Sequence, residues 1–168
     1  MLASAGGVFI VSNDALTSIS LPVLASAGGV FIESNDALTT FSLPVLASVG
    51  GDLVISNNAA LTSISLPALA SVGFTVSISN NAALTSISLP ALASAGGNVG
   101  ITLNATLTTI SLPVLESAAG GVSIGSNAAL TSISFPVLSS AGFVSIGDND
   151  ALTTCTGALI VNVGDCVQ

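Results

Sequence analysis

Residues 61–83 read LTSISLPALASVGFTVSISNNAA, and residues 84–106 repeat the pattern as LTSISLPALASAGGNVGITLNAT. The unit recurs in steps of 22 or 23 residues along the chain of 168 residues, up to a C-terminal tail in which the pattern is lost. A fixed period of this kind is the sequence signature of a solenoid, in which each unit forms one coil and packs only against its neighbours. The repeat therefore decides the fold, and the phase of a residue within the coil predicts its role.

The coil is expected to be all β, because β-branched residues are frequent and strong helix formers are scarce. Residues 63–65 and 76–78 alternate apolar and polar side chains, which is typical of a half-buried strand. A proline ends the first of these segments, and small turn residues precede the second. We therefore expect a parallel β-solenoid of seven coils with two short strands per coil over residues 1–156, followed by a capping tail, residues 157–168.

The pattern L-x-x-I-x-L, with an asparagine at a fixed phase, is similar to a leucine-rich repeat. The longer unit S-x-G-G-x-V-x-I-x-x-N-x-A-L resembles more closely the receptor L-domain type of solenoid. This resemblance covers residues 2–153 and implies a fold rather than a function. Receptor L domains bind protein ligands through irregular charged or aromatic surface residues, which this chain lacks, so that role does not carry over.

The composition excludes several functions. The chain has eight acidic residues, a formal charge of −8, and no lysine, arginine, histidine, tryptophan or tyrosine. Without basic side chains it has nothing to pair with phosphate, which argues against binding of nucleic acid or of anionic membrane surfaces. No apolar run is long enough for a membrane span, and the first residues do not read as a signal peptide. Because the usual acid–base side chains are missing, we expect a protein that is not an enzyme and needs no cofactor.

The carboxylates do not suggest an active site. Glycosidases need two carboxylates close together, whereas Glu33 and Glu116 lie several repeats apart. Asp14 and Asp36 occupy the same phase of adjacent coils, which fits solvated turn residues or a weak Ca²⁺ site. Residues 148–150, Asp-Asn-Asp, give a similarly weak indication.

One asparagine recurs at the same phase of every coil. It is expected to point inward and to bond to backbone groups and to the next asparagine in the stack. This structural asparagine ladder comprises Asn13, Asn35, Asn58, Asn81, Asn104, Asn127 and Asn149. Asn104 also begins the one N-x-T sequon, and as a member of the inward ladder it is expected to carry no glycan.

The two cysteines suggest a staple at the C-terminal end. Cys155 occupies the inward phase that isoleucine or phenylalanine fills in earlier coils, and Cys166 lies in the tail. A disulfide between them would hold the tail across the last coil and would indicate an extracellular or cell-surface location. The alternative is two buried thiols without a bond. A metal site is disfavoured, because two thiols without histidine are too few ligands.

The N-terminal coil shows no equivalent cap. An uncovered strand edge tends to pair with another chain. A truncated longer solenoid, an end-to-end contact between copies, and a docking edge for another protein are all open interpretations.

The outward positions of the first strand carry only small hydroxyls, since they flank its inward residue. We define the hydroxyl face as these two columns together with an invariant threonine column at the corner of the coil. The corner column is Thr17, Thr39, Thr62, Thr85, Thr108, Thr131 and Thr153. The strand columns are Ser18, Thr40, Ser63, Ser86, Thr109, Ser132 and Thr154, and Ser20, Ser42, Ser65, Ser88, Ser111, Ser134 and Thr156. The outward column of the second strand is irregular: Phe9, Phe31, Val54, Ser77, Gly100, Ser123 and Ser145.

A flat, uncharged array of hydroxyls on a parallel sheet resembles the ice-binding face of solenoid antifreeze proteins. The resemblance implies ice or ordered water as the partner, and we expect an extracellular, non-catalytic ice-binding protein. One alternative is a structural or cell-surface solenoid, such as a fibre or matrix component with O-glycosylated columns, which would contact other copies of itself. Another is a protein-recognition module that uses Phe9 and Phe31 as its only exposed aromatic residues.

Overall fold

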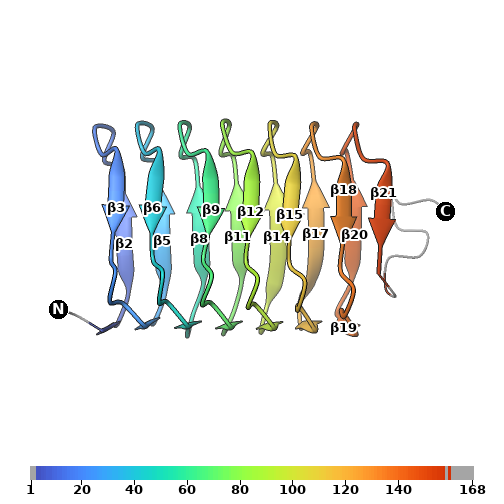
Figure 1. Cartoon of the computed structure of the whole chain (residues 1–168), viewed down its shortest axis with the longest axis horizontal. Helices are drawn as coiled ribbons and strands as arrows, with labels where there is room; N and C mark the ends of the chain where they lie inside the picture. The colour runs from blue at the N-terminus through green and yellow to red at the C-terminus, as the bar shows by residue number, and fades with distance from the viewer. Residues whose placement is uncertain (1–2, 158, 160–168) are drawn as a thin grey trace.

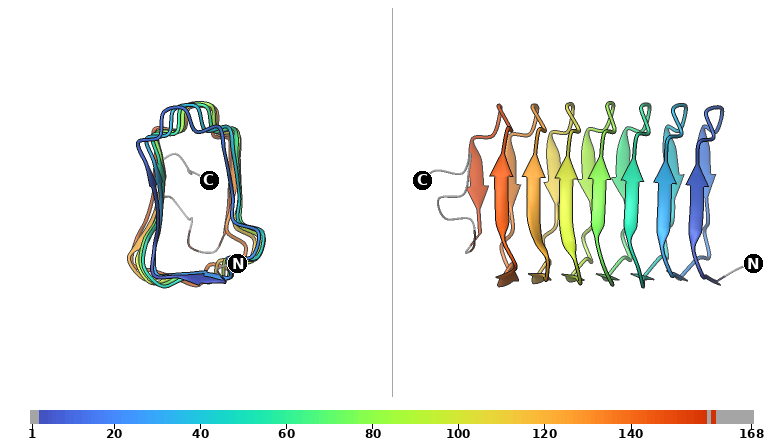
Figure 2. Two further views of the ribbon diagram at one scale, coloured as in Figure 1. Left: turned by 90° about the vertical axis from the view of Figure 1, so that its left-hand side faces the viewer. Right: turned by 180° about the vertical axis from the view of Figure 1, so that it is seen from behind.

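The computed structural model describes residues 3–157 and residue 159, and it forms an all-β parallel solenoid (Figure 1). The coils stack along one axis, and the end-on view of Figure 2 shows them nearly superimposed. The described residues contain strands and turns without a helix, so no helix in this part of the chain is able to cross a membrane. The solenoid fold predicted from the repeat is confirmed.

Each coil contains three strands, so the expectation of two is wrong. The additional strand is only two residues long, as in Ser71–Val72, and lies before the four-residue strand Val76–Ser79. Alternation of apolar and polar residues cannot be recognised over two positions, which is why the pattern did not reveal it.

The three strands of successive coils build three walls, in which strands pair in parallel with their equivalents one coil on, except between β6 and β9 of the third wall. The short wall consists of β1 (Ser4–Ala5), β4 (Ser26–Ala27), β7 (Ser48–Val49), β10 (Ser71–Val72), β13 (Ser94–Ala95), β16 (Ser117–Ala118) and β19 (Ser140–Ala141). The long wall consists of β2 (Val8–Val11), β5 (Val30–Glu33), β8 (Leu53–Ser56), β11 (Val76–Ser79), β14 (Asn98–Thr102), β17 (Gly121–Gly125) and β20 (Val144–Gly147). The hydroxyl wall consists of β3 (Ser18–Ser20), β6 (Thr40–Ser42), β9 (Ser63–Ser65), β12 (Ser86–Ser88), β15 (Thr109–Ser111), β18 (Ser132–Ser134) and β21 (Thr154–Thr156).

The inward side chains of the walls form one continuous apolar core. In the middle coils Leu66, Leu69 and Ile78 are fully buried, each with 0% of its surface exposed. A single coil has no second layer to cover these side chains, so their burial depends on the coils above and below. Because burial of apolar surface is the main stabilising contribution, the stack is stable only as an assembly of coils.

Successive coils approach most closely at the corner between the short and long walls. A Cβ atom on Gly73 would collide with the carbonyl oxygen of Gly50, and one on Gly96 with that of Gly73, so glycine is required at these two positions. The extra residue of the longer coils lies at the same corner, because Ser26 pairs with Ser48 while Val30 pairs with Leu53. The change in coil length is therefore absorbed away from the hydroxyl wall.

The asparagine ladder runs beneath the turn that joins the long wall to the hydroxyl wall. Asn13 is exposed, and the other six members are between 0% and 3% exposed. Asn81 is typical: its backbone N–H and its Nδ2 donate to Oδ1 of Asn104 at 3.1 and 3.2 Å. Its Nδ2 also donates to the carbonyl of Ile55 at 3.0 Å, and its Oδ1 accepts from the backbone N–H of Asn58 at 3.1 Å. Each asparagine inside the ladder thus ties its own turn to both neighbouring coils.

The residue before each ladder asparagine adopts a left-handed backbone conformation. These residues are Ser12, Ser34, Asn57, Asn80, Leu103, Ser126 and Asp148, with φ between 55° and 59°. Asparagine and aspartate tolerate this conformation, whereas Leu103 is a branched apolar residue that is strained there and is 52% exposed. The turn geometry is thus kept in every coil even where the side chain is unsuited to it.

Cys155 lies in β21, where it is half-buried and pairs in register with Ile133. Cys166 lies outside the described residues, as does nearly all of the tail. The disulfide and the boundary between the solenoid and the capping tail therefore stay predictions.

Replacement of Asn81 by alanine should lower the free energy of unfolding by roughly 3 kcal/mol or more, because it leaves buried donors and acceptors on both adjacent coils without partners. Urea denaturation followed by circular dichroism measures this loss. The matched control is Asn13→Ala, which removes an exposed member at the end of the ladder and should cost much less. Equal losses for the two variants would show that the ladder does not stabilise the stack.

Candidate functional surface

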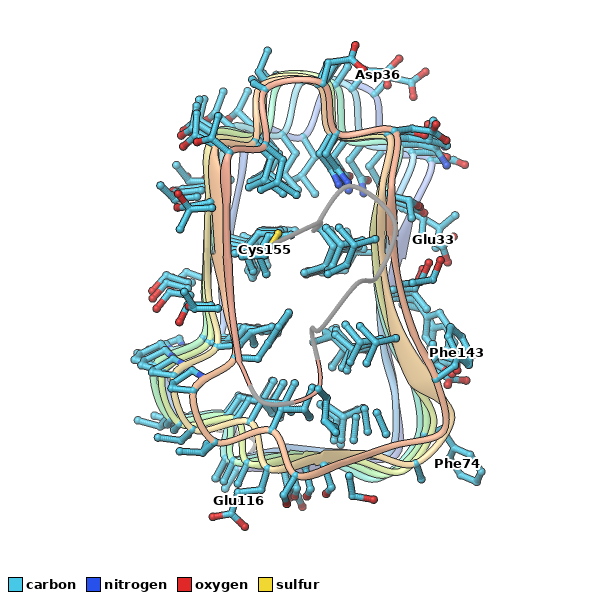
Figure 3. The ribbon with its side chains drawn as sticks, turned by 90° about the vertical axis from the view of Figure 1, so that its right-hand side faces the viewer. Glu33, Asp36, Phe74, Glu116, Phe143 and Cys155 are labelled. Carbon is cyan, nitrogen blue, oxygen red and sulfur yellow. The ribbon has the colours of Figure 1, made fainter. Side chains whose placement is uncertain are left out.

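The hydroxyl face lies on the outside of the hydroxyl wall. Of its residues Ser86 and Ser88 are half-buried, and the others are exposed. Figure 3 looks along the stack and shows Cys155, at the phase between the two strand columns, pointing into the core on the side opposite Glu33 and Phe143. The columns therefore occupy a wall of their own.

The strand columns are in register from coil to coil in the middle of the stack. Ser63 pairs with Ser86 and Ser86 with Thr109, and the second column follows the same order. Hydroxyl positions along a column are therefore separated by about 4.8 Å, and the two columns of one strand by about 6.7 Å. The pleat and the pairing fix these positions, so the array is rigid.

The array is less continuous than the sequence predicts. The β3–β6 pair forms a sheet separate from the five-stranded sheet β9–β12–β15–β18–β21. Within the larger sheet, β15 and β18 keep only the pair Thr109 and Ser132 in register. Strands β9, β12 and β15 form the longest fully paired part of the hydroxyl face, and we call them the regular patch.

Both interruptions coincide with a phenylalanine in the core. Phe41 stands in β6 where most coils have isoleucine, and Phe135 directly follows β18 where the earlier coils have leucine. A hollow of about 100 Å³ lies near the second interruption, bounded by Ser111, Leu112 and Ser134 among others. Extra volume in a close-packed core shifts the backbone around it, which offers a steric explanation for the loss of pairing on one side of each strand.

The corner threonines are held by the protein itself. The hydroxyls of Thr39, Thr85 and Thr108 each donate to the carbonyl of the corner threonine one coil earlier at 3.0 Å, and Thr153 does so at 3.3 Å. Their protons are thus engaged between coils. The corner column reinforces the stack, and the two strand columns present the freer hydroxyls.

No carboxylate lies on the hydroxyl face among the described residues. Figure 3 shows Asp36 at the turn, Glu33 on the long wall and Glu116 at the short wall. Asp14 and Asp36 are exposed, and within the described part of the chain no group of three or more acidic or cysteine side chains is placed to hold a metal ion.

The exposed aromatic residues differ from those expected. Phe9 is 70% exposed, but Phe31 is half-buried and stacks on it with ring centroids 5.0 Å apart and an angle of 4° between the rings. Phe74 and Phe143, 62% and 48% exposed, were missed. The expectation that Phe9 and Phe31 are the only exposed aromatic residues is therefore wrong. Phe74 and Phe143 each follow a glycine at the corner between the short and long walls, where other coils have a second glycine. The replacement of this second glycine by phenylalanine is the sequence signal that could have revealed both exposed rings.

Several of these rings lie over glycines. A Cβ atom on Gly7 would meet the ring of Phe9, and one on Gly121 would meet the ring of Phe143. An aromatic ring that covers a glycine in a sheet compensates for its missing side chain, which applies to Gly121 at the start of β17. Phe143 therefore has a structural role beside the long wall.

Comparison of the chain with protein-family models, with curated proteins and with solved structures finds no match in any of the three. Interpretation of the hydroxyl face therefore depends on its own geometry and chemistry.

Removal of a corner hydroxyl should cost more than removal of a strand hydroxyl. Thr85→Val keeps the side-chain shape but loses the bond to the carbonyl of Thr62, and should lower the free energy of unfolding by about 1 kcal/mol. Ser63→Ala, on an exposed position of the regular patch, should stay within about 0.5 kcal/mol of the parent chain. Urea denaturation compares the two, and a larger loss for Ser63→Ala would contradict the distinction between the columns.

Proposed function

We propose that the chain is a non-catalytic extracellular protein that binds ice through the hydroxyl face, with the regular patch as the main contact. The observation that carries the proposal is the in-register array of small, uncharged hydroxyls on a rigid parallel sheet. The similarity of the repeat to receptor L-domain solenoids is part of this proposal and is supported by the sequence pattern alone.

Ordered water needs acceptors and donors at fixed positions. Serine and threonine side chains are short, so little conformational freedom is lost when water is ordered against them. The backbone pairing of β9, β12 and β15 fixes the spacing between hydroxyls in both directions. Charged groups would hold a hydration shell of their own, and the face contains none. These properties support the adsorption of an ice-like water layer.

The test is the gap between the melting and freezing points of a solution of the protein, together with the shape of ice crystals grown in it. Ser88→Tyr, at the centre of the regular patch, should reduce the gap strongly because the ring lifts the crystal surface off the neighbouring hydroxyls. The matched control is Ser77→Tyr, which makes the same change one strand earlier on the long wall. It should leave the gap unchanged.

Round ice crystals at millimolar concentrations of the parent protein would refute ice binding. An equal loss of activity in both tyrosine variants, with circular dichroism unchanged, would show that the active surface is not the hydroxyl face.

One observation favours a second candidate, a structural solenoid that packs side by side in a fibre or matrix. Four valines that each follow a proline at the same phase are exposed: Val23 by 36%, Val45 by 44%, Val114 by 40% and Val137 by 45%. This apolar row would be covered by lateral packing of one copy on another, and O-glycans on the serine and threonine columns fit the same role. Filaments or lateral sheets in electron micrographs would support this candidate, and a strictly monomeric sedimentation profile would oppose it.

We also propose that a disulfide between Cys155 and Cys166 staples the tail to the last coil. The half-buried position of Cys155 beside Ile133 supports the proposal, because a covering segment is needed there to complete the core. The bond also supports an extracellular or cell-surface location.

Reduction of this bond should lower the free energy of unfolding by about 2–3 kcal/mol, since it opens a short loop. The measurement is urea denaturation with and without dithiothreitol. Cys166→Ser should be as unstable as the reduced chain and insensitive to dithiothreitol. Two reactive thiols in the denatured, unreduced protein would show that no disulfide forms.

A further inference from the structure

Among the described residues, which begin at residue 3, the N-terminal end of the stack leaves part of the apolar core open. Hydrophobic residues of the first coil are only partly buried there, namely Ala5, Val8, Ile10, Leu16 and Leu21. Their equivalents in the second coil are between 0% and 5% exposed, namely Ala27, Val30, Ile32, Leu38 and Leu43.

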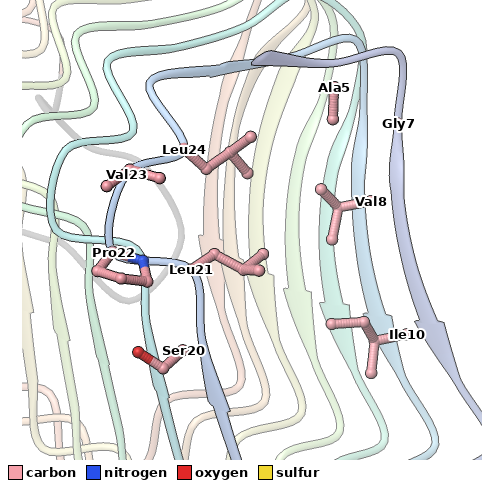
Figure 4. Close-up of a pocket in the computed structure, with 9 residues that line it drawn as sticks. All are labelled: Ala5, Gly7, Val8, Ile10, Ser20, Leu21, Pro22, Val23 and Leu24. Atoms are coloured by element: carbon pink, nitrogen blue, oxygen red, sulfur yellow. The ribbon is translucent and has the colours of Figure 1, made fainter. Parts of the chain in front are cut away.

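A pocket of about 450 Å³ opens at this end (Figure 4). Its lining is apolar almost throughout, with Leu21 and Leu24 facing Val8 and Ile10 across the opening. Water is a poor occupant for such a space, because few polar groups are available to it.

The edge of the long wall at this end has a defined hydrogen-bonding pattern. The backbone N–H of Val8 donates to Gly29 at 2.8 Å, and that of Ser12 donates to Glu33 at 3.0 Å, so these residues direct their polar groups toward the second coil. Successive residues of a strand point their N–H and C=O groups in opposite directions within the sheet. Phe9 therefore directs its backbone N–H and C=O away from β5, toward the open edge.

The aromatic stack ends at the same place. Phe9 lies on Phe31 with almost parallel rings, and Phe9 itself is 70% exposed. The centroid separation of 5.0 Å is close to the distance between neighbouring strands, so one more strand with an aromatic residue at this position would extend the stack.

We propose that two copies of this chain associate head to head through their N-terminal ends. The strand β2 pairs antiparallel with β2 of the second copy about a twofold axis at Phe9. Two residues directly opposite in a hydrogen-bonded antiparallel pair exchange both of their N–H···O=C bonds. The axis thus satisfies the open backbone groups of Phe9 in both copies, joins the two aromatic stacks into one row, and brings the two apolar openings together.

Symmetry identifies a second copy as the occupant, because an identical end offers the same open backbone groups, exposed ring and apolar opening, and the charge distribution permits the contact. The chain carries eight acids and no basic residue, so every contact between charged side chains of two copies is repulsive. The described residues of the first coil, 3–24, contain a single charge, Asp14, which is exposed on a turn and does not line the pocket. Two such ends meet with little repulsion, and a basic partner finds almost nothing to pair with there. The proposal does not depend on ice binding.

The geometry of the axis is tested by a cross-link. Opposite residues in a hydrogen-bonded antiparallel pair have Cα atoms about 5.5 Å apart, which is within the range that a disulfide spans. Phe9→Cys should therefore give a covalent dimer under mild oxidation, seen on a non-reducing gel and by intact mass. Phe74→Cys is the matched control, because Phe74 is 62% exposed but lies in the middle of the stack. It should remain uncross-linked.

Association itself is tested by sedimentation velocity of the 168-residue chain over a range of concentrations. The parent chain and Phe74→Asp should be dimers. Phe9→Asp places two carboxylates at the axis and should be a monomer with an unchanged circular dichroism spectrum. A monomeric parent chain would overturn the proposal. So would a dimer that survives Phe9→Asp, or one in which Phe9→Cys does not cross-link, since either result places the contact elsewhere on the molecule.

Discussion

The in-register contact between successive coils is the constraint on which the structure depends. No coil covers its own apolar side chains, and every buried leucine or isoleucine is closed off by residues 22 or 23 positions away. The asparagine ladder makes this contact directional, because each amide and backbone N–H donates to Oδ1 of the next asparagine toward the C-terminus. A coil is thus stable only between neighbours of the same shape, which explains why so few positions of the repeat vary.

The effect of a change in the repeat on strand pairing depends on whether the change lies at a corner or in the core. The extra residue of the longer coils is accommodated at the corner between the short and long walls, where it leaves the strand registers intact. Phe41 and Phe135 fall inside the core, and both coincide with lost pairing in the hydroxyl wall. Length is therefore tolerated at a corner without loss of register, whereas added volume in the core coincides with lost pairing on one side of the strand beside it.

The sequence was sufficient for the features that depend on periodicity alone. The parallel solenoid and the phase of the inward isoleucines follow from a repeat that places equivalent residues on top of one another. Features that depend on short segments or on single exceptions could not be inferred in this way. The two-residue strand at Ser71–Val72 has too few positions to show alternation, and the left-handed residue before each asparagine has no fixed identity, as Leu103 shows. The break beside Phe41 could not be inferred either, because the outward residues of that coil follow the repeat.

The hydroxyl face shows that the residue pattern of a surface does not fix the spacing of its strands, and this difference matters for function. The residues that form the hydroxyl face are nearly identical from the first coil to the last, yet the longest fully paired group contains three strands, β9, β12 and β15, and the pairs β3–β6 and β18–β21 are separated from it. A partner that recognises individual hydroxyls is indifferent to this difference. A crystalline partner such as ice matches a lattice, so it is sensitive to any change in spacing between strands. If ice is the partner, the contact area depends on how many strands keep a regular spacing. The side chains packed beneath the hydroxyl face influence that spacing, so a core phenylalanine affects the contact area as much as a substitution on the surface does.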